Sequence, residues 1–196
     1  MAQREPDYRV DPLFLGRWSP RAFDGSDMPE EDLMTLFEAA RWAPSAFNSQ
    51  PWRFLYARRG DRAWERFLDL LIPWNRGWAK SASALIYILS DSLPFIAKDG
   101  EPATSHTHSY DSGAAWACLA LQASLMGYQA HGMSGVDFER AQAELGVPER
   151  YRIEAAAAVG RIGDPATLPE KLRAREFPSG RKPVEEFAFR GSFPSP

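Results

Sequence analysis

The sequence has a single cysteine, little net charge and no long apolar run, and each absence excludes a class of protein. Cys118 has no partner within the chain, and its place in an apolar helical pattern favours a small core residue. The formal net charge of −3 gives no electrostatic basis for a nucleic-acid or anionic-membrane partner. No stretch approaches the roughly 18 to 20 apolar residues that span a bilayer, and the N-terminus lacks the apolar core of a signal peptide. We therefore expect a cytoplasmic protein without a membrane partner.

Several catalytic signatures are also missing. The chain has no G-x-G-x-x-G after a strand, no G-x-x-x-x-G-K-[ST] phosphate loop and no G-x-S-x-G elbow. Its three histidines leave little material for a hydrolase triad. His106 and His108 would share one face of a strand, as in some metal sites, but no cysteine or second ligand cluster accompanies them. We therefore predict no metal centre and disfavour classical nucleotide folds and hydrolases.

The chain does contain enough apolar material for one sizeable core. Its 196 residues are 44% hydrophobic and 13% aromatic, and no repeat or linker divides them. We predict a single domain over residues 1–196, with a core at about 14–165. An extension rich in proline and charge follows at 166–196. Its residues Phe187, Phe189 and Phe193 favour packing, such as on another subunit, over a disordered end.

Hydrophobic spacing predicts a mixed helix and strand fold after an irregular stretch at residues 1–16. Asp27 is the expected cap of the first long helix, and the segment 73–78 breaks the helical pattern. The helix at 111–126 is apolar nearly all round, which places it in the middle of the fold. Residues 131–137 have the composition of a glycine-rich turn. Helices are expected at 27–42, 61–71, 111–126 and 137–145, and strands at 52–57, 84–89 and 153–159.

Two polar stretches are candidates for ligand contacts. Residues 43–54, APSAFNSQPWRF, form a loop between a helix and a strand that is dense in hydrogen-bonding side chains and bounded by prolines. Such a loop either turns the chain or holds a ligand. Arg17 and Arg21 flank Ser19 and offer planar donor forks suited to phosphate, although a solvated surface turn has the same composition. The residues alone leave both alternatives open.

The order of five segments resembles the FMN-dependent nitroreductase family. The segments are RWSPRAF, EEDLMTLFEAARWAPSAFNSQPWRF, DSGAAWACLALQASLMGY, MSGVD and RKPVEEF, and the resemblance spans about Arg17 to Glu186. It implies an α+β three-layer sandwich with a mostly antiparallel central sheet flanked by helices. It also implies an intertwined homodimer with two FMN sites at the subunit interface. The long central helix would form much of the dimer contact, and the C-terminal tail would cross to the partner.

The resemblance also implies the cofactor contacts, position by position. Around the FMN phosphate and the pyrimidine edge it assigns Arg17, Trp18 through its backbone, Ser19, Arg21, Arg161, Arg181 and Lys182. Around the isoalloxazine it assigns Pro44, Ser45 and Asn48 of the other subunit, Gln50 in support, Asn75 at a flavin edge, and Met133, Ser134 and Gly135 in a turn against the ring. No side chain receives a catalytic role, because flavin N5 carries the chemistry.

The activity implied by this resemblance is oxidation of NADH or NADPH with reduction of a small-molecule acceptor, such as a nitroaromatic or a quinone, by ping-pong hydride transfer. Two alternatives stay open. One is a family offshoot that uses the flavin for dehydrogenation, dehalogenation or flavin destruction, and the other is a non-enzymatic flavin-binding or storage protein. Trp74 and Trp78 are expected to line an open substrate pocket with residues 90–110, with a subunit contact or ordinary packing as the alternatives.

Overall fold

Four antiparallel strands form the central sheet. The computed structural model describes residues 4–98 and 100–194, and the strands lie in the order β1–β2–β6–β5. Their bounds are β1 (Trp52–Arg58), β2 (Ala84–Asp91), β5 (Gln129–Met133) and β6 (Tyr151–Gly160). Each of the three pairings is antiparallel. All of β2 is buried, because its run of apolar residues lies between two other strands and under helices on both faces.

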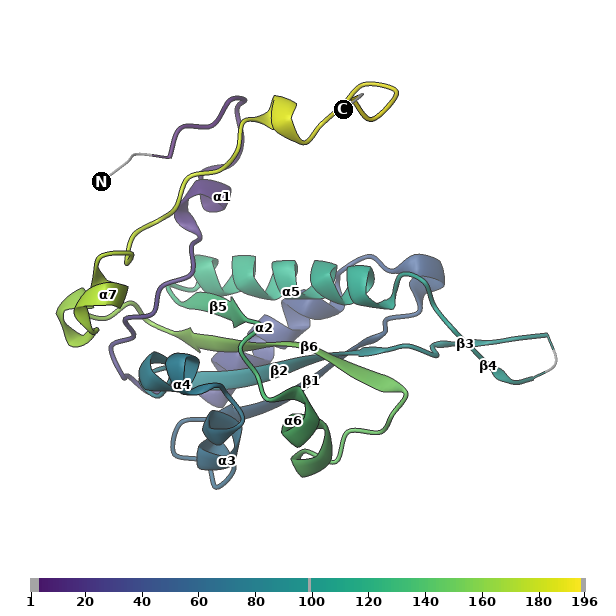
Figure 1. Ribbon diagram of the computed structural model, residues 1–196, viewed down its shortest axis with the longest axis horizontal. Coiled ribbons are helices and arrows are strands. Elements are labelled where there is room, and N and C mark those ends of the chain that lie inside the picture. The colour runs from purple at the N-terminus through teal and green to yellow at the C-terminus, as the bar shows by residue number, and fades with distance from the viewer. Residues whose placement is uncertain (1–3, 99, 195–196) are drawn as a thin grey trace.

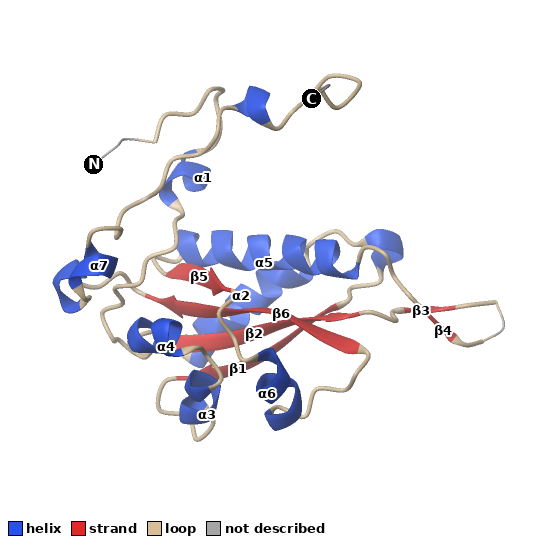
Figure 2. Ribbon diagram, viewed as in Figure 1, coloured by secondary structure: helices blue, strands red, loops and turns tan. Residues whose placement is uncertain are grey.

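Helices cover both faces of this sheet and give three layers (Figure 1). One layer holds α2 (Glu30–Arg41) and α5 (His108–Leu125), and the other holds α3 (Trp64–Asp69), α4 (Pro73–Ala79) and α6 (Phe138–Glu144). Successive side chains of a strand point to opposite faces, so Ile86 and Ile88 join one apolar core while Leu85 and Leu89 join the other. Figure 2 shows the sheet in red between the two blue helical layers. The predicted α+β three-layer fold is confirmed.

The strongest sequence patterns are present as predicted. The strands expected at 52–57, 84–89 and 153–159 are β1, β2 and β6, each extended by one or a few residues. The apolar helix expected at 111–126 is α5, which begins three residues earlier, at His108, and ends before Gly127 at φ 78°. α5 crosses the sheet as the longest helix of the described chain.

Several element boundaries were predicted wrongly. The helix expected from Asp27 begins at Glu30, and Asp27 pairs with Arg59 at 3.3 Å instead of capping it. The helix expected at 61–71 covers only the six residues of α3. The segment 73–78 was expected to interrupt the helical pattern, but Pro73 begins α4, because a proline's fixed φ and missing N–H suit the first helical turn. Residues 131–133 belong to β5, so the glycine-rich turn is limited to residues 134–137.

The two ends of the chain run side by side away from the sheet (Figure 1). The N-terminal segment, residues 4–16, is not wholly irregular, because it contains α1 (Pro12–Gly16) with Asp11 as its cap. The C-terminal tail, residues 174–194, follows α7 (Glu170–Arg173). Asp7 Oδ2 accepts a hydrogen bond from the Val184 N–H at 2.9 Å and joins the two segments. The tail's contact with a partner subunit, and the single-domain assignment, stay predictions.

The remaining elements are short. β3 (Phe95–Ile96) and β4 (Pro102–Ala103) form a hairpin at the opposite end of the molecule from α7 (Figure 1). Single 3-10 turns cover Ala46–Asn48, Pro165–Thr167 and Val184–Glu186. Within residues 4–98 and 100–194, no helix combines the length and apolarity that crossing a bilayer requires.

Candidate functional site

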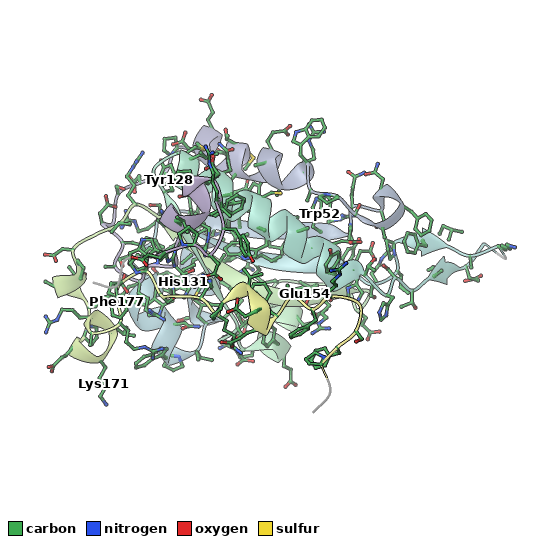
Figure 3. All side chains as sticks on the ribbon, turned by 90° about the horizontal axis from the view of Figure 1, so that it is seen from above. Trp52, Tyr128, His131, Glu154, Lys171 and Phe177 are labelled. Carbon is green, nitrogen blue, oxygen red and sulfur yellow. The ribbon has the colours of Figure 1, made fainter. Side chains whose placement is uncertain are left out.

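Most of the residues assigned to the flavin fall into two groups at opposite ends of α5. We call residues 44–50 the loop end, because they lie beside the first turn of the helix. We call Arg17, Ser19, Arg21 and Arg181, with the side chains that hold them, the arginine end. Eighteen helical residues separate the two ends by about 27 Å. In Figure 3, Tyr128 and His131 lie toward the end of the molecule that holds Lys171 and Phe177, whereas Trp52 and Glu154 lie nearer the middle.

The backbone at the loop end is strained. Phe47, Asn48 and Gln50 have φ values of 52°, 54° and 47°, and among the described residues they are the only ones other than glycine with positive φ. Such left-handed backbone is uncommon for residues with a Cβ and gathers at ligand-binding and catalytic segments. The side chains of Pro44, Asn48 and Gln50 are exposed. The loop thus presents polar groups outward in an unusual conformation, which a plain turn does not require.

A buried carboxylate holds the loop in this conformation. Asp111, in the first turn of α5, is 3% exposed, and its Oδ2 accepts hydrogen bonds from the Ala46 N–H and from Thr107 Oγ1, both at 3.1 Å. Within the loop, Ser45 Oγ accepts the Gln50 N–H at 3.0 Å. Ser45 and Gln50 therefore support the loop structurally, and the sequence pattern gave no signal for the role of Asp111.

Three guanidinium groups gather at the arginine end. Arg17 and Arg181, far apart in sequence, are joined there by Arg4, which no motif indicated. Burial, together with the neighbouring guanidinium of Arg181, lowers the pKa of both Arg4 and Arg17. None of the three forms an ion pair with a carboxylate in the described part of the chain. Uncompensated positive charge of this kind fits an anion.

A histidine holds the backbone between Arg17 and Arg21. The Pro20 carbonyl lies 2.8 Å from His131 Nδ1, and because a carbonyl only accepts, Nδ1 carries the proton. The imidazole packs on Trp78, with ring centroids 4.6 Å apart. Burial lowers the pKa of His131 to about 4, and the positive charges of Arg21 and Arg17 act in the same direction. His131 is therefore neutral near pH 7 and works as a hydrogen-bond donor from β5.

Two further side chains hold this segment. Gln129 Oε1 accepts the Trp18 N–H at 3.2 Å. Glu176 Oε1 accepts the backbone N–H groups of Arg21 and Ala22 at 2.6 and 2.8 Å. Glu176 Oε2 lies 3.8 Å from Arg21 Nη1, which is within ion-pair range but too long for a hydrogen bond. The charge of Arg21 is thus partly balanced by a buried carboxylate that the sequence did not indicate.

The turn after β5 makes a close contact with α4. Asn75 Nδ2 donates to the Gly135 carbonyl at 3.2 Å, so the two residues that the resemblance placed near the flavin ring do meet. A Cβ at Gly135 would lie 2.3 Å from Asn75 Nδ2 and 2.7 Å from Ile72 Cδ1. Ser134 is exposed beside them, whereas the side chain of Met133 is buried in the core, leaving only its backbone for a ligand.

Two of the assigned basic residues contact other side chains, and the two assigned tryptophans differ in exposure. Arg161 stacks on the Tyr128 ring at 4.3 Å, and Lys182 pairs with Glu186 at 3.7 Å. Trp74 is 54% exposed, as expected of a pocket wall, but Trp78 is only 2% exposed. The expectation that Trp78 lies open to a substrate is wrong, because the ring fills the core between Phe23 and His131.

Unsatisfied polar atoms mark the same two ends. Within the described residues, four buried side-chain atoms lack a hydrogen-bond partner. Ser49 Oγ and Ser112 Oγ lie near the loop end, while Trp78 Nε1 and Glu176 Oε2 lie near the arginine end. Buried polar groups are normally paired, so orphans of this kind indicate bound water or ligand. Both ends therefore contain buried polar atoms that a bound group would satisfy.

The outer face of α5 connects the two ends. Tyr110 is 79% exposed and Leu125 is 64% exposed, one at each end of the helix, and Gly113 and Ala117 between them are also exposed. These positions follow helical spacing and form one apolar stripe. An exposed stripe of this length on the longest helix is typical of a protein contact surface.

The chain is similar in sequence and in fold to known proteins. Residues 15–77 match the model of the nitroreductase family. An uncharacterized 15.4 kDa protein of Mycolicibacterium smegmatis is 37% identical over 74% of this chain and 99% of its own. A Streptomyces coelicolor protein named "Putative NADH dehydrogenase/NAD(P)H nitroreductase" is 33% identical over 76% and 80%. A crystal structure described as an oxidoreductase containing FMN superposes with a TM-score of 0.95 at 49% identity, covering 98% of this chain and 97% of that one.

Proposed function

The chain belongs to the nitroreductase family, and from this premise we propose that it is an FMN-dependent NAD(P)H oxidoreductase. Its small-molecule acceptor would be a nitroaromatic, a quinone or a related compound. The similar solved protein is described as containing FMN, and the name of the Streptomyces relative contains NAD(P)H nitroreductase. The first description supports FMN as the cofactor of this chain, and the second supports NAD(P)H as its electron donor.

The observation that carries the proposal is the group of guanidiniums at the arginine end. Arg17 and Arg181 have no carboxylate partner in the described residues, although bringing like charges together costs free energy. A phosphate monoester such as that of FMN carries nearly two negative charges and accepts the planar forks of arginine. The residues present therefore fit the phosphate of FMN, with Ser19 as an additional hydroxyl donor.

The rest of the cofactor would extend from this phosphate toward the turn after β5. Gly135 and the adjacent Ser134 offer backbone groups, and Asn75 offers an amide beside them. Arg21 offers positive charge at a pyrimidine edge, which favours the reduced flavin. Bound FMN would supply the redox chemistry between NAD(P)H and the acceptor. This chain then needs only to bind, orient and shield the reactants, so the absence of a nucleophile or general base in the sequence is expected.

The loop end would reach the cofactor of a second copy. A single FMN is shorter than the roughly 27 Å between the two ends of α5, so one chain does not supply both groups to one flavin. In a dimer with a twofold axis near the middle of α5, the loop end of each copy meets the arginine end of the other. The exposed apolar stripe of α5, with Tyr110 and Leu125 at its ends, is suited to that self-contact. We propose a homodimer with two composite FMN sites.

An anaerobic absorbance titration tests the activity. Purified protein loaded with FMN should show a flavin band that bleaches on addition of NADH or NADPH and returns when a quinone or nitroaromatic is added. A flavin band that neither nucleotide bleaches would overturn the oxidoreductase proposal and favour a flavin-binding protein. Protein that takes up no FMN at all would overturn the cofactor proposal.

A further inference from the structure

Arg4 makes more backbone contacts than either of the two arginines beside it. Its Nε donates to the Ser179 carbonyl at 2.9 Å, and its Nη1 donates to the Leu15 and Arg17 carbonyls, both at 2.8 Å. One side chain thus holds the end of α1, the residue that follows it and the C-terminal tail. Arg4 Nη2 has no hydrogen-bond partner in the described residues and remains free to donate.

These contacts fix the two residues that the phosphate would need. Arg17 itself supplies one of the carbonyls that accept a hydrogen bond from Arg4, and Arg181 follows Ser179 by two residues in the tail. The side-chain hydrogen bonds of Arg181 reach only Ser179 and Gly180, so they do not attach the tail to the N-terminal segment. In the described residues, Asp7 also joins these segments, through its contact with Val184, three residues beyond Arg181. Of these two contacts between the segments, the one made by Arg4 lies next to the guanidiniums of Arg17 and Arg181.

The arrangement costs free energy in the absence of an anion. Arg4 brings Arg17 and Arg181 close to each other and to its own charge, and burial together with the proximity of Arg181 lowers the pKa of Arg17. Like charges at such separations repel even in a partly solvated site. Arg4 and Arg181 also line a hollow of about 730 Å³ between the terminal segments. An anion with several acceptor oxygens would compensate the repulsion.

We propose that Arg4 assembles the phosphate end of the FMN site by joining the N-terminal segment to the C-terminal tail. This inference rests on the proposed cofactor and adds a positioning residue to it. Arg4 acts mainly through Arg17 and Arg181, with Nη2 available as a further donor. The role requires the planar fork of arginine, because three carbonyls are bound in different directions from Nε and Nη1. A lysine at this position keeps the charge but not that geometry.

The test compares FMN with riboflavin, which lacks the phosphate. Full-length protein stripped of flavin is titrated with each compound for the wild type, Arg4→Ala, Arg4→Lys and Arg9→Ala. Arg9 is an exposed arginine of the same N-terminal segment, so Arg9→Ala is a matched control for the loss of one positive charge. We expect Arg4→Ala and Arg4→Lys to weaken FMN binding roughly tenfold or more, the scale of one charge-assisted contact, and to leave riboflavin binding unchanged. Arg9→Ala should bind both like the wild type.

The outcomes separate this inference from the proposed function. Wild-type protein that binds no FMN would contradict the cofactor itself. If the wild type binds FMN, three results would overturn the role of Arg4: an undiminished preference for FMN over riboflavin in Arg4→Ala, equal loss of both ligands, or full FMN binding by Arg4→Lys. Should Arg4→Ala fail to fold, Arg4→Lys provides the same comparison with the charge retained.

Discussion

The two ends of α5 differ in the physical means by which they would recognise the proposed ligand. The arginine end presents three guanidiniums without carboxylate partners in the described chain, and its backbone is held by side chains from β5 and from the segment after α7. Residues 44–50 of the loop end contain no charged side chain, and one guanidinium, that of Arg53, donates to the Gln50 carbonyl at 2.9 Å. Its polar groups are displayed by a strained backbone that one buried carboxylate, Asp111, holds in place. The first end is suited to an anion, whereas the second is suited to a flat, largely neutral ring.

This difference explains why neither end forms a complete site alone. The arginine end alone offers no surface for the ring and would bind any phosphate. The loop end alone has no charged side chain and would not retain a mononucleotide. The two halves are about 27 Å apart along one helix, and in the proposed homodimer a second copy would bring them together. Substitutions at the arginine end should therefore weaken the binding only of ligands that carry a phosphate. Substitutions at the loop end should weaken the binding of flavins with and without a phosphate.

The largest expected effect on FMN binding comes from removing two arginines of the arginine end together. Arg17→Ala with Arg181→Ala should weaken FMN binding roughly a hundredfold, since two charge-assisted contacts are lost. Riboflavin binding should hardly change, because riboflavin has no phosphate. Fluorescence titrations of the two ligands measure this difference. An equal loss for both ligands would show that the arginine end does not recognise the phosphate.

Acid should act on the arginine end through His131. The pKa of this buried residue is lowered to about 4, whereas an unfolded histidine titrates near about 6.5. Between these values the unfolded chain binds a proton that the folded chain does not, so stability falls as the pH falls. From pH 7 to pH 5 we expect a loss of about 2 kcal/mol in the free energy of unfolding from this residue.

A matched pair of variants isolates that contribution. His131→Asn keeps an N–H donor for the Pro20 carbonyl but does not titrate, so its unfolding free energy should lack this part of the pH dependence. His106→Asn, at an exposed position, should retain the dependence of the wild type. Denaturant unfolding at the two pH values provides the measurement, and parallel behaviour of wild type and His131→Asn would contradict the prediction.

Loosening the loop end should affect FMN and riboflavin alike. Asp111→Ala removes the acceptor of the Ala46 N–H and of Thr107 Oγ1, and the loop then loses the bonds that hold its strained conformation. We expect roughly tenfold weaker binding of both flavins. Asp27→Ala, at an exposed carboxylate remote from the loop, is the control. If Asp111→Ala weakened the binding of FMN but not that of riboflavin, the two ends would not differ in this way.

The smallest effect concerns the acceptor. Trp74 is half exposed near Asn75, and its ring is the one tryptophan of the expected pair that a substrate can touch. Trp74→Ala should raise KM about threefold for bulky aromatic acceptors, the scale of one aromatic contact, without changing the rate with a small quinone. Steady-state assays with both acceptors check this, and identical KM values would exclude Trp74 from the pocket. Trp78→Ala, in contrast, should act through stability, since that ring lies in the core.

The sequence predicted those parts of the structure that depend on local pattern. The apolar runs of β2 and β6 and the long helix α5 are set by hydrophobic spacing, and all three were identified. Pro73 was misleading because proline both ends helices and begins them, and the sequence does not say which. Trp78 was misleading because a tryptophan in a polar segment has the same local pattern whether it faces solvent or the core.

No local sequence pattern identifies the residues that hold the candidate site together. Arg4, His131 and Glu176 act through backbone carbonyls or N–H groups of distant segments, and any sequence presents those groups. Family resemblance named the groups that would touch the cofactor, such as Arg17 and Arg181. It did not name the groups that hold them, because those contacts depend on how the termini fold onto each other.

Complementation between two defective chains tests the composite site most directly. One chain carries Arg17→Ala with Arg181→Ala at the arginine end, and the other carries Asn48→Glu at the loop end. Neither homodimer should retain FMN. The mixed dimer, purified with two different tags, contains one site with both halves damaged and one with both halves intact. The account predicts one FMN for each mixed dimer, and a mixed dimer without FMN would contradict it.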